Sequence, residues 1–236
     1  MSTEKESKLN RQYIFWYFVI FSIIGLVVET LFGYATTGTI DSRKGLIWGP
    51  FCPIYGVGAI ILIFFLQKYE KQNWKVFVYG GIIGGIIEYV ISFILEAMYS
   101  SRFWDYSHLS LHLNGRICLK YTIYWSILSI ALMKYIKPWI DEHIIEKYSK
   151  KKHFKIIEKI LFIFLVVDAI VTVWAISAYK DRALDTYYNR QTEKEDSIIK
   201  NIEENYFSNK KMLKTFPNLR VQVDDGKEMF IRDILK

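Results

Sequence analysis

The sequence predicts an all-α protein, a polytopic bundle of about five transmembrane helices with a small C-terminal appendage. Hydrophobic residues make up 52% of its 236 residues and aromatic residues 17%. The apolar residues are gathered into blocks of about 20, the length that crosses a hydrocarbon core of ~30 Å. Lys and Arg are concentrated between the blocks. The expected spans are 14–36, 50–67, 75–99, 117–136 and 157–179.

The first block, 14–36, has Trp16 and Tyr17 at one edge and Tyr34 near the other, where amphipathic rings meet the membrane interface. Basic residues before an apolar stretch are also typical of a signal peptide. The length of this run and Glu29 within it favour an uncleaved anchor.

Glycine and proline break regular helix in the segment 43–58, which leads into the second block. Irregular backbone at membrane depth survives only where protein or water satisfies its polar groups. The segment is therefore either a re-entrant, cavity-lining element or a tight surface loop with aromatic anchors. Its motif residues are Gly49, Pro50, Cys52, Pro53, Tyr55 and Gly56.

The third block carries a stripe of small residues, which lets a neighbouring helix backbone approach closely. Glu88 lies near the middle of this block and Glu96 eight residues later, about 80° around a helix, so both can face one interior side. The stripe consists of Gly80, Gly81, Gly84 and Gly85.

Trp104 and Asp105 precede the fourth block, and Asn114-Gly115 follows them as a turn signal. Arg116 and Lys120 come directly after this turn, four residues apart, where the span begins. These two cations are expected on one face, either snorkelling to headgroups or pairing with acids. The acids within reach would be Glu29, Glu96 and Asp105.

The fifth block holds Asp168 midway along it. The chain therefore divides into a transmembrane bundle, 1–179, and an extramembrane tail, 180–236. In the tail we expect a helix to about Lys214 and then a short hairpin across Asp225-Gly226.

The placement of basic residues predicts the orientation. Loop 134–159 contains eight Lys, and the N-terminus 1–13 and loop 68–75 hold three basic residues each. Loops 37–49 and 97–116 hold two each. Since cytoplasmic loops are enriched in Lys and Arg, the N-terminus should be cytoplasmic and the tail extracytoplasmic. The net charge of +7 thus reflects topology and not nucleic-acid binding, for which no motif is present.

The sequence contains no recognisable metal, nucleotide or catalytic motif. The four His residues make no metal-ligand spacing with Cys52 or Cys118, and no G-x-x-x-x-G-K-[ST] loop occurs. We therefore expect no cofactor. Cys52 and Cys118 lie near the external ends of their spans, which permits either a disulfide or two buried thiols.

Four acids inside apolar runs, Glu29, Glu88, Glu96 and Asp168, need compensation, because an intramembrane carboxylate costs roughly 2.5–3.5 kcal/mol. Such residues usually face a bundle interior, pair with a cation or line a solute path. The primary candidates for solute or ion contact are Glu29, Glu88, Arg116, Asp105, Asn114, Trp104 and Lys120; Glu96 and Asp168 are secondary.

Two loop motifs, GLIWGPFCPIYGVG at 45–58 and WDY at 104–106 with LNGRICLKY at 113–121, resemble the family of small bacterial membrane proteins described as putative ABC-transporter type IV, or CmpB-like permeases. The resemblance covers about residues 15 to 140. Glu29 and Glu88 match glutamates of that family's first and third spans. It implies a multi-pass permease-like protein of the bacterial cytoplasmic membrane.

The leading hypothesis is a transport component that moves a small solute through a polar cavity, energised by a separate ATPase docking on loop 134–159. Because five spans are few for a complete pore, assembly from two or more chains is expected. A second hypothesis is an intramembrane enzyme acting on lipid or lipid-linked substrates, with Glu29 or Glu88 as acid/base and Arg116 holding a phosphate. A third is a structural or partner-binding membrane protein.

Overall fold

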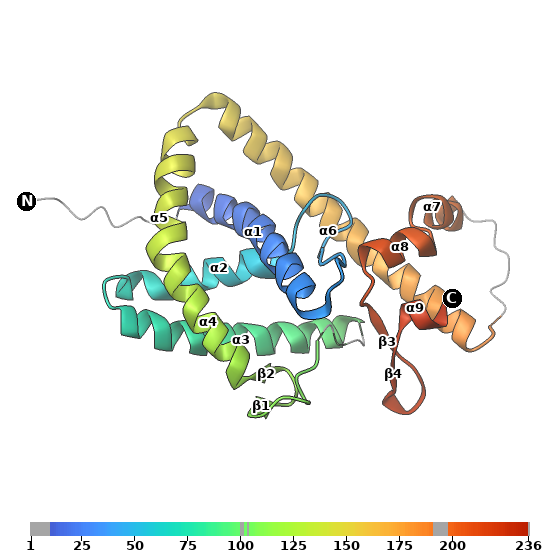
Figure 1. Ribbon diagram of the computed structural model, residues 1–236. Helices are drawn as coiled ribbons and strands as arrows, with labels where there is room; N and C mark the ends of the chain where they lie inside the picture. Colours follow the sequence, from blue (N-terminus) through green and yellow to red (C-terminus); the bar gives the residue numbers. More distant parts are fainter. Residues whose placement is uncertain (1–9, 100–101, 103, 191–197, 236) are drawn as a thin grey trace, which may run out of the picture.

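The computed structural model describes residues 10–99, 102, 104–190 and 198–235 (Figure 1). Its larger part is a bundle of helices, and a smaller C-terminal unit packs on one end of the longest helix, α6. Lys5 and Lys8, on which the expected orientation partly depends, lie outside the described residues.

Three helices of the described chain are long and apolar enough to cross a membrane. They are α1 (Arg11–Thr37), α3 (Asn73–Tyr99) and α6 (Lys152–Tyr187). Helix α1 begins where the side chain of Asn10 accepts hydrogen bonds from two backbone amides of the first turn. It ends at Gly38, whose φ of 72° is the left-handed conformation that closes many helices.

The second and fourth expected spans are shorter as helices than their apolar runs. Helix α2 (Pro53–Leu66) has 14 residues, about 21 Å at 1.5 Å per residue, because the Gly/Pro-rich residues before it fold as an irregular loop. Helix α4 (Leu119–Ala131) has 13. Helix α2 is too short to cross a membrane alone, and α4 reaches that length only with the helical turns that follow it. Three helices of the described chain meet the length and composition of a crossing by themselves, so the expected five spans are not confirmed.

The helix that begins in the fourth expected span, 117–136, does not end with that span. The helix continues through a π-helical turn (Leu132–Ile136), α5 (Lys137–Ile140) and a second π-helical stretch (Asp141–Glu146). Proline removes one backbone donor and its ring crowds the preceding turn, which normally breaks an α-helix. Here the wider π turn before it accommodates the ring, and the amide of Lys137 donates five residues back, to the carbonyl of Leu132.

Helices α1 with α2, and α3 with α4, pack along each other. The α3 glycines allow this approach: a Cβ on Gly84 would lie 2.5 Å from Cγ of Trp125, and one on Gly80 would lie 2.3 Å from Cβ of Ser129. Gly81 likewise faces Ser126. Small residues thus bring the α3 and α4 backbones together.

The C-terminal unit consists of α7 (Ile198–Tyr206), α8 (Asn209–Thr215), β3 (Arg220–Gln222), β4 (Glu228–Phe230) and α9 (Ile231–Ile234). The two strands form an antiparallel hairpin around Gly226, whose φ is 77°. The continuous helix expected from residue 180 to Lys214 is not observed, because α6 ends at Tyr187 and separate helices follow; residues 191–197 lie outside the described chain.

This unit is attached to the last turns of α6 by a separate apolar core that includes Tyr179 and Ala183. Arg182 of α6 adds polar contacts, donating to Oδ1 of Asn209 and to the carbonyl of Phe207, both at 2.8 Å. The tail is therefore a packed part of the fold.

Candidate functional site

Glu88 lies on α3 in the interior of the bundle, with 8% of its surface exposed. Its two carboxylate oxygens accept hydrogen bonds from different elements. The hydroxyl of Tyr106, from the loop after α3, donates to Oε1 at 2.8 Å, and the indole Nε1 of Trp125, from α4, donates to Oε2 at 3.1 Å. Both donors are electrically neutral.

Glu29 lies on α1 and is half-buried. Its Oε2 accepts a hydrogen bond from the hydroxyl of Tyr55 on α2, at 2.5 Å. The close approach of α1 and α2 that aligns this pair depends on Gly25, where a Cβ would lie 2.2 Å from the side chain of Tyr55.

The two acids belong to one electrostatic site. Burial, the adjacent Glu88 carboxylate and the more distant Glu29 all raise the pKa of the Tyr106 phenol, so this hydroxyl keeps its proton and remains a donor. Within the described chain, no Lys or Arg forms an ion pair with Glu29 or Glu88. Two carboxylates without a cation thus lie inside the bundle.

The loop that supplies Tyr106 is shaped by a β-hairpin, β1 (His112–Leu113) with β2 (Ile117–Cys118). Asn114 and Gly115 have positive φ of 52° and 67°, as at the central residues of a type I′ turn, for which Asn-Gly is the favoured sequence. The amide of Arg116 closes this turn on the carbonyl of Leu113 at 3.0 Å, and three residues separate the paired Leu113 and Ile117. The carbonyl of Gly115 accepts from the backbone amide of Tyr106 at 2.8 Å. The ring of Tyr106 also stacks on Tyr121 of α4, with centroids 4.4 Å apart.

Arg116, at the end of this turn, does not reach Glu29 or Glu88. Its guanidinium forms an ion pair with Glu96 and donates to Oγ of Ser92 at 3.1 Å. Glu96 also pairs with Arg102, at 3.2 Å. The structure therefore pairs Arg116 with Glu96, one of the three acids that the sequence offers as partners.

Arg116 and Lys120 do not share a helix face, because α4 begins at Leu119 and Arg116 belongs to the hairpin. The Lys120 ammonium is exposed and lies over the rings of Tyr121 and Tyr124, at 5.8 and 6.0 Å from their centroids. It therefore marks the rim of the site rather than its interior.

The other hairpin candidates hold the loop in place. Trp104 donates to the carbonyl of Arg116 at 3.1 Å, and Asn114 donates to the hydroxyl of Tyr89 at 2.9 Å. Asp105 accepts two hydrogen bonds of 2.9 Å from Ser107. Partial burial alone would raise the pKa of Asp105, but these hydrogen bonds, with nearby Arg102 and Arg220 charges, hold it below its ordinary value.

The Gly/Pro-rich loop packs between α1 and α6. The amide of Ile47 donates to Oγ1 of Thr172 at 3.0 Å, and that of Trp48 donates to Oδ1 of Asp168 at 3.2 Å. On the opposite side, the amide of Cys52 donates to the carbonyl of Ser22 at 3.0 Å. Protein groups thus satisfy this irregular backbone, as burial requires.

Asp168 is fully buried and serves this loop rather than the Glu29–Glu88 site. Its Oδ1 also accepts from the Thr172 hydroxyl at 3.2 Å, while Oδ2 has no hydrogen-bond partner among the described residues. Cys52 and Cys118 are both buried and their thiols are free.

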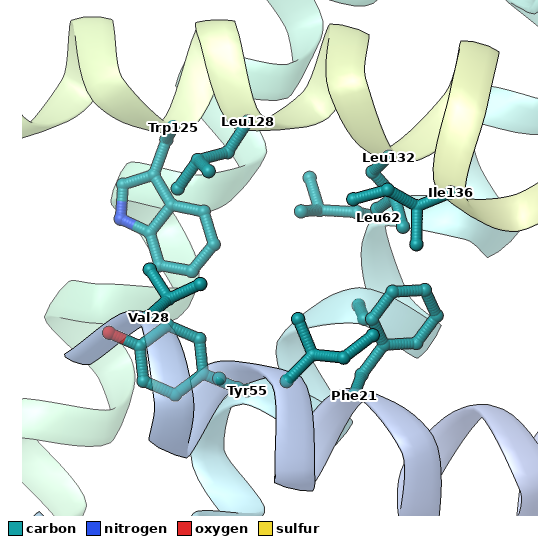
Figure 2. A pocket seen from close by; sticks show the side chains of 11 residues that line it. Phe21, Val28, Tyr55, Leu62, Trp125, Leu128, Leu132 and Ile136 are labelled. Atoms are coloured by element: carbon teal, nitrogen blue, oxygen red, sulfur yellow. The ribbon is translucent and has the colours of Figure 1, made fainter. Parts of the chain in front are cut away.

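An apolar pocket of about 100 Å³ lies beside the acids, between α1, α2 and α4 (Figure 2). Tyr55 and Trp125 lie side by side at one end of it, with their polar atoms on the same edge of the view. Those atoms are the ones that donate to Glu29 and Glu88. The rest of the lining includes Phe21, Leu62, Leu128, Leu132 and Ile136.

Sequence reasoning singled out both acids but assigned no role to their partners Tyr106 and Trp125. Tyr106 stands in the WDY motif and Trp125 lies in an apolar span, so only the fold shows that both point at Glu88. For Trp125 the sequence does carry a signal, because an aromatic residue with a polar atom inside an apolar block usually has a hydrogen-bond partner. Tyr106 lies in a loop and carries no such signal.

A family model described as "Putative ABC-transporter type IV" matches residues 16–173, well over half of the chain. The chain belongs to this family. The match covers α1 to α4 and most of α6, and it leaves the C-terminal unit outside. This confirms the resemblance drawn from the two loop motifs. No curated protein and no solved structure matches the chain.

Family membership and the three long apolar helices identify the chain as a membrane protein of a transporter family. Among the described residues, no three His, Cys, Asp or Glu side chains gather into a group that could hold a metal ion.

Proposed function

We propose that the chain is a membrane transport component and that a small solute contacts the site formed by Glu29, Tyr55, Glu88, Tyr106 and Trp125. The supporting observation is the pair of carboxylates on α1 and α3, Glu88 buried and Glu29 half-buried, which accept hydrogen bonds from neutral donors and form no ion pair with a cation of the described chain. An intramembrane acid that no protein cation neutralises is expected to serve an ion or solute path.

In this proposal the chain crosses the bacterial cytoplasmic membrane about five times. The N-terminus is cytoplasmic and the C-terminal unit extracytoplasmic, as the basic residues of loop 134–159 favour. A helix as short as α2 does not span the hydrocarbon core, so the backbone at its ends must be shielded from lipid by neighbouring protein or by a second copy of the chain. This requirement fits assembly from two or more chains.

The transport proposal is tested by comparing cells that produce the wild-type chain, Glu88→Gln or Glu204→Gln, with solute levels in cells and medium measured by mass spectrometry. Glu204 is a matched control because it is exposed on α7 of the C-terminal unit, away from the site. At least one solute should redistribute with the wild type and the control but not with Glu88→Gln. Identical profiles for wild type and Glu88→Gln, at equal membrane levels, would remove Glu88 from the mechanism.

We also propose that a separate ATPase docks on segment 134–159, which the structure folds as helical turns that continue α4 and pack on the bundle core through Ile140 and Ile145 (Figure 1). Trp139, 55% exposed, stacks on His143 there, and Tyr135 one turn earlier is 69% exposed. Large exposed rings at one helix end are typical of a protein contact or of a membrane interface.

The docking proposal is tested with a photo-crosslinking residue at Trp139 in native membranes, and at Trp48, on the opposite expected side, as control. An ATPase subunit should crosslink to position 139 and not to position 48. Repeated recovery of no ATPase from position 139 would reject this partner.

A further inference from the structure

The apolar pocket and the acid pair meet at the side chains of Tyr55 and Trp125. Tyr55 and Trp125 line the pocket with their rings, while their polar atoms point out of its end toward Glu29 and Glu88 (Figure 2). A ligand in the pocket would therefore have apolar walls along its length and aromatic rings backed by carboxylates at one end.

The charge at this end is not balanced by the described protein. Tyrosine and indole donors stabilise a carboxylate but leave its charge in place. Two basic residues near the site are engaged elsewhere: Arg116 with Glu96, and Lys120 over two tyrosine rings. A third, Arg43, lies against Gly33, one turn from Glu29 on α1, but forms no ion pair with either acid among the described residues. The end of the pocket therefore favours a positively charged group and repels an anion.

Resting on the function proposed above, we propose that this site binds an organic ammonium ion. Its charged head lies between Glu29 and Glu88, against the aromatic faces of Tyr55 and Trp125, and its short aliphatic tail fills the pocket. Aromatic faces attract an ammonium group through their quadrupole, most strongly where water is excluded.

The walls distinguish this ligand from an inorganic cation. Hard metal ions require about six or more oxygen ligands, whereas the described lining of this pocket is aliphatic and aromatic. The volume also limits the tail. A cavity of ~150 Å³ holds a benzene ring, so about 100 Å³ suits a chain of roughly four carbons.

The test is calorimetric titration of the full-length protein in lipid nanodiscs, with empty nanodiscs subtracted. The probes are methyl-, ethyl- and butylammonium, with butyrate, 1-butanol, Na⁺ and K⁺ for comparison. Affinity should rise about fourfold for each added methylene that is buried. Butylammonium should bind at least tenfold more tightly than 1-butanol, and butyrate should not bind.

Three variants and one control separate the head site from the tail site. Glu88→Gln and Glu29→Gln should each weaken butylammonium at least tenfold, whereas the control Glu204→Gln, at an exposed position of α7, should not change it. Leu128→Phe, at a partly exposed position of the pocket wall, should abolish the gain from methyl- to butylammonium and leave methylammonium binding unchanged. Helix content and elution volume of each variant report whether it is folded.

Binding of Na⁺ or K⁺ as tight as that of butylammonium, binding of butyrate, or no binding of any ammonium probe would overturn the proposal. These outcomes are distinguishable from failure of the transport function. Glu88-dependent solute movement without ammonium binding would overturn only the ligand class, whereas Glu88-dependent ammonium binding without solute movement would overturn only transport.

Discussion

The two acids of α3 differ in how their charges are compensated. Glu96 is paired with Arg116 and Arg102, and Arg102 also approaches Glu228 of the C-terminal hairpin at 3.8 Å. Glu88, two turns earlier on the same helix, meets only the neutral donors Tyr106 and Trp125. Both are carboxylates on one apolar helix, yet one is balanced within the protein and the other is not.

This difference separates structural from functional acids. A partly buried ion pair holds its elements together, and removing one partner strands the other charge. A buried carboxyl group held by neutral donors contributes less to folding and remains available to a ligand or a proton. The comparison therefore predicts opposite responses to the same Glu→Gln change.

The largest expected effect is that of Glu96→Gln on stability. It leaves the buried Arg116 guanidinium without its carboxylate, and we expect the free energy of unfolding to fall by roughly 2–3 kcal/mol. That is less than the ~3–5 kcal/mol of a fully buried pair, since Glu96 is partly exposed. Glu88→Gln should change it by less than ~1 kcal/mol, because the lost acceptor is offset by removal of an uncompensated charge.

Reversible unfolding in mixed detergent micelles measures both values for Glu88→Gln and Glu96→Gln. A larger loss for Glu88→Gln than for Glu96→Gln would reverse the assignment of the two acids.

A second effect concerns the packing that places Trp125 against Glu88. Gly84→Ala puts a methyl group 2.5 Å from Cγ of Trp125, and overpacking of this kind costs about 1–3 kcal/mol. The neighbouring Gly85→Ala is the matched control, since its Cβ would lie an ordinary 3.6 Å from Thr122. Gly85→Ala should be neutral or stabilising, because Ala is the better helix former.

The readout for both glycine variants is the thermal midpoint, with butylammonium affinity as a second measure. Equal losses for Gly84→Ala and Gly85→Ala would show that the close contact between α3 and Trp125 is not needed for stability or for ammonium binding.

Much of this arrangement follows from the sequence, and the remainder depends on tertiary contacts. Apolar blocks predict long helices, and Asn114-Gly115 predicts its turn from local chemistry. Helix ends were less predictable: the apolar block 117–136 ends shortly before Pro138, but the helix continues through π-helical turns on both sides of that proline. The partner of Arg116 was one of several options, because which acid lies within reach depends on where α4 begins. Tyr106 and Trp125, 18 and 37 residues from Glu88, are brought to it only by the fold.

A third effect tests whether the neutral donors belong to the site. Tyr106→Phe removes the hydroxyl that donates to Glu88 and should cost about 1–2 kcal/mol of stability, as expected for a hydrogen bond to a charged group. Tyr188→Phe also removes a donor to a carboxylate, that of Asp224, but at the exposed surface. It should be nearly neutral.

For Tyr106→Phe we also expect weaker binding of butylammonium, whereas Tyr188→Phe should leave it unchanged. Equal changes in stability and in butylammonium affinity for the two phenylalanine variants would show that the buried hydrogen bond to Glu88 contributes no more than the exposed one to Asp224.

The smallest effect is the pH dependence of the hairpin. The pKa of Asp105 is lower in the folded chain than its unfolded value of ~3.9, because Ser107 and nearby arginines favour the charged form. Its contribution to stability is therefore complete above pH ~4 and is lost as the pH falls through the folded pKa. The pH at which Asp105 titrates can be followed by NMR of a 13C-labelled carboxyl group. A midpoint above ~3.9 would show that its burial outweighs its hydrogen bonds, and the loop holding Tyr106 would then gain stability as the pH falls instead of losing it.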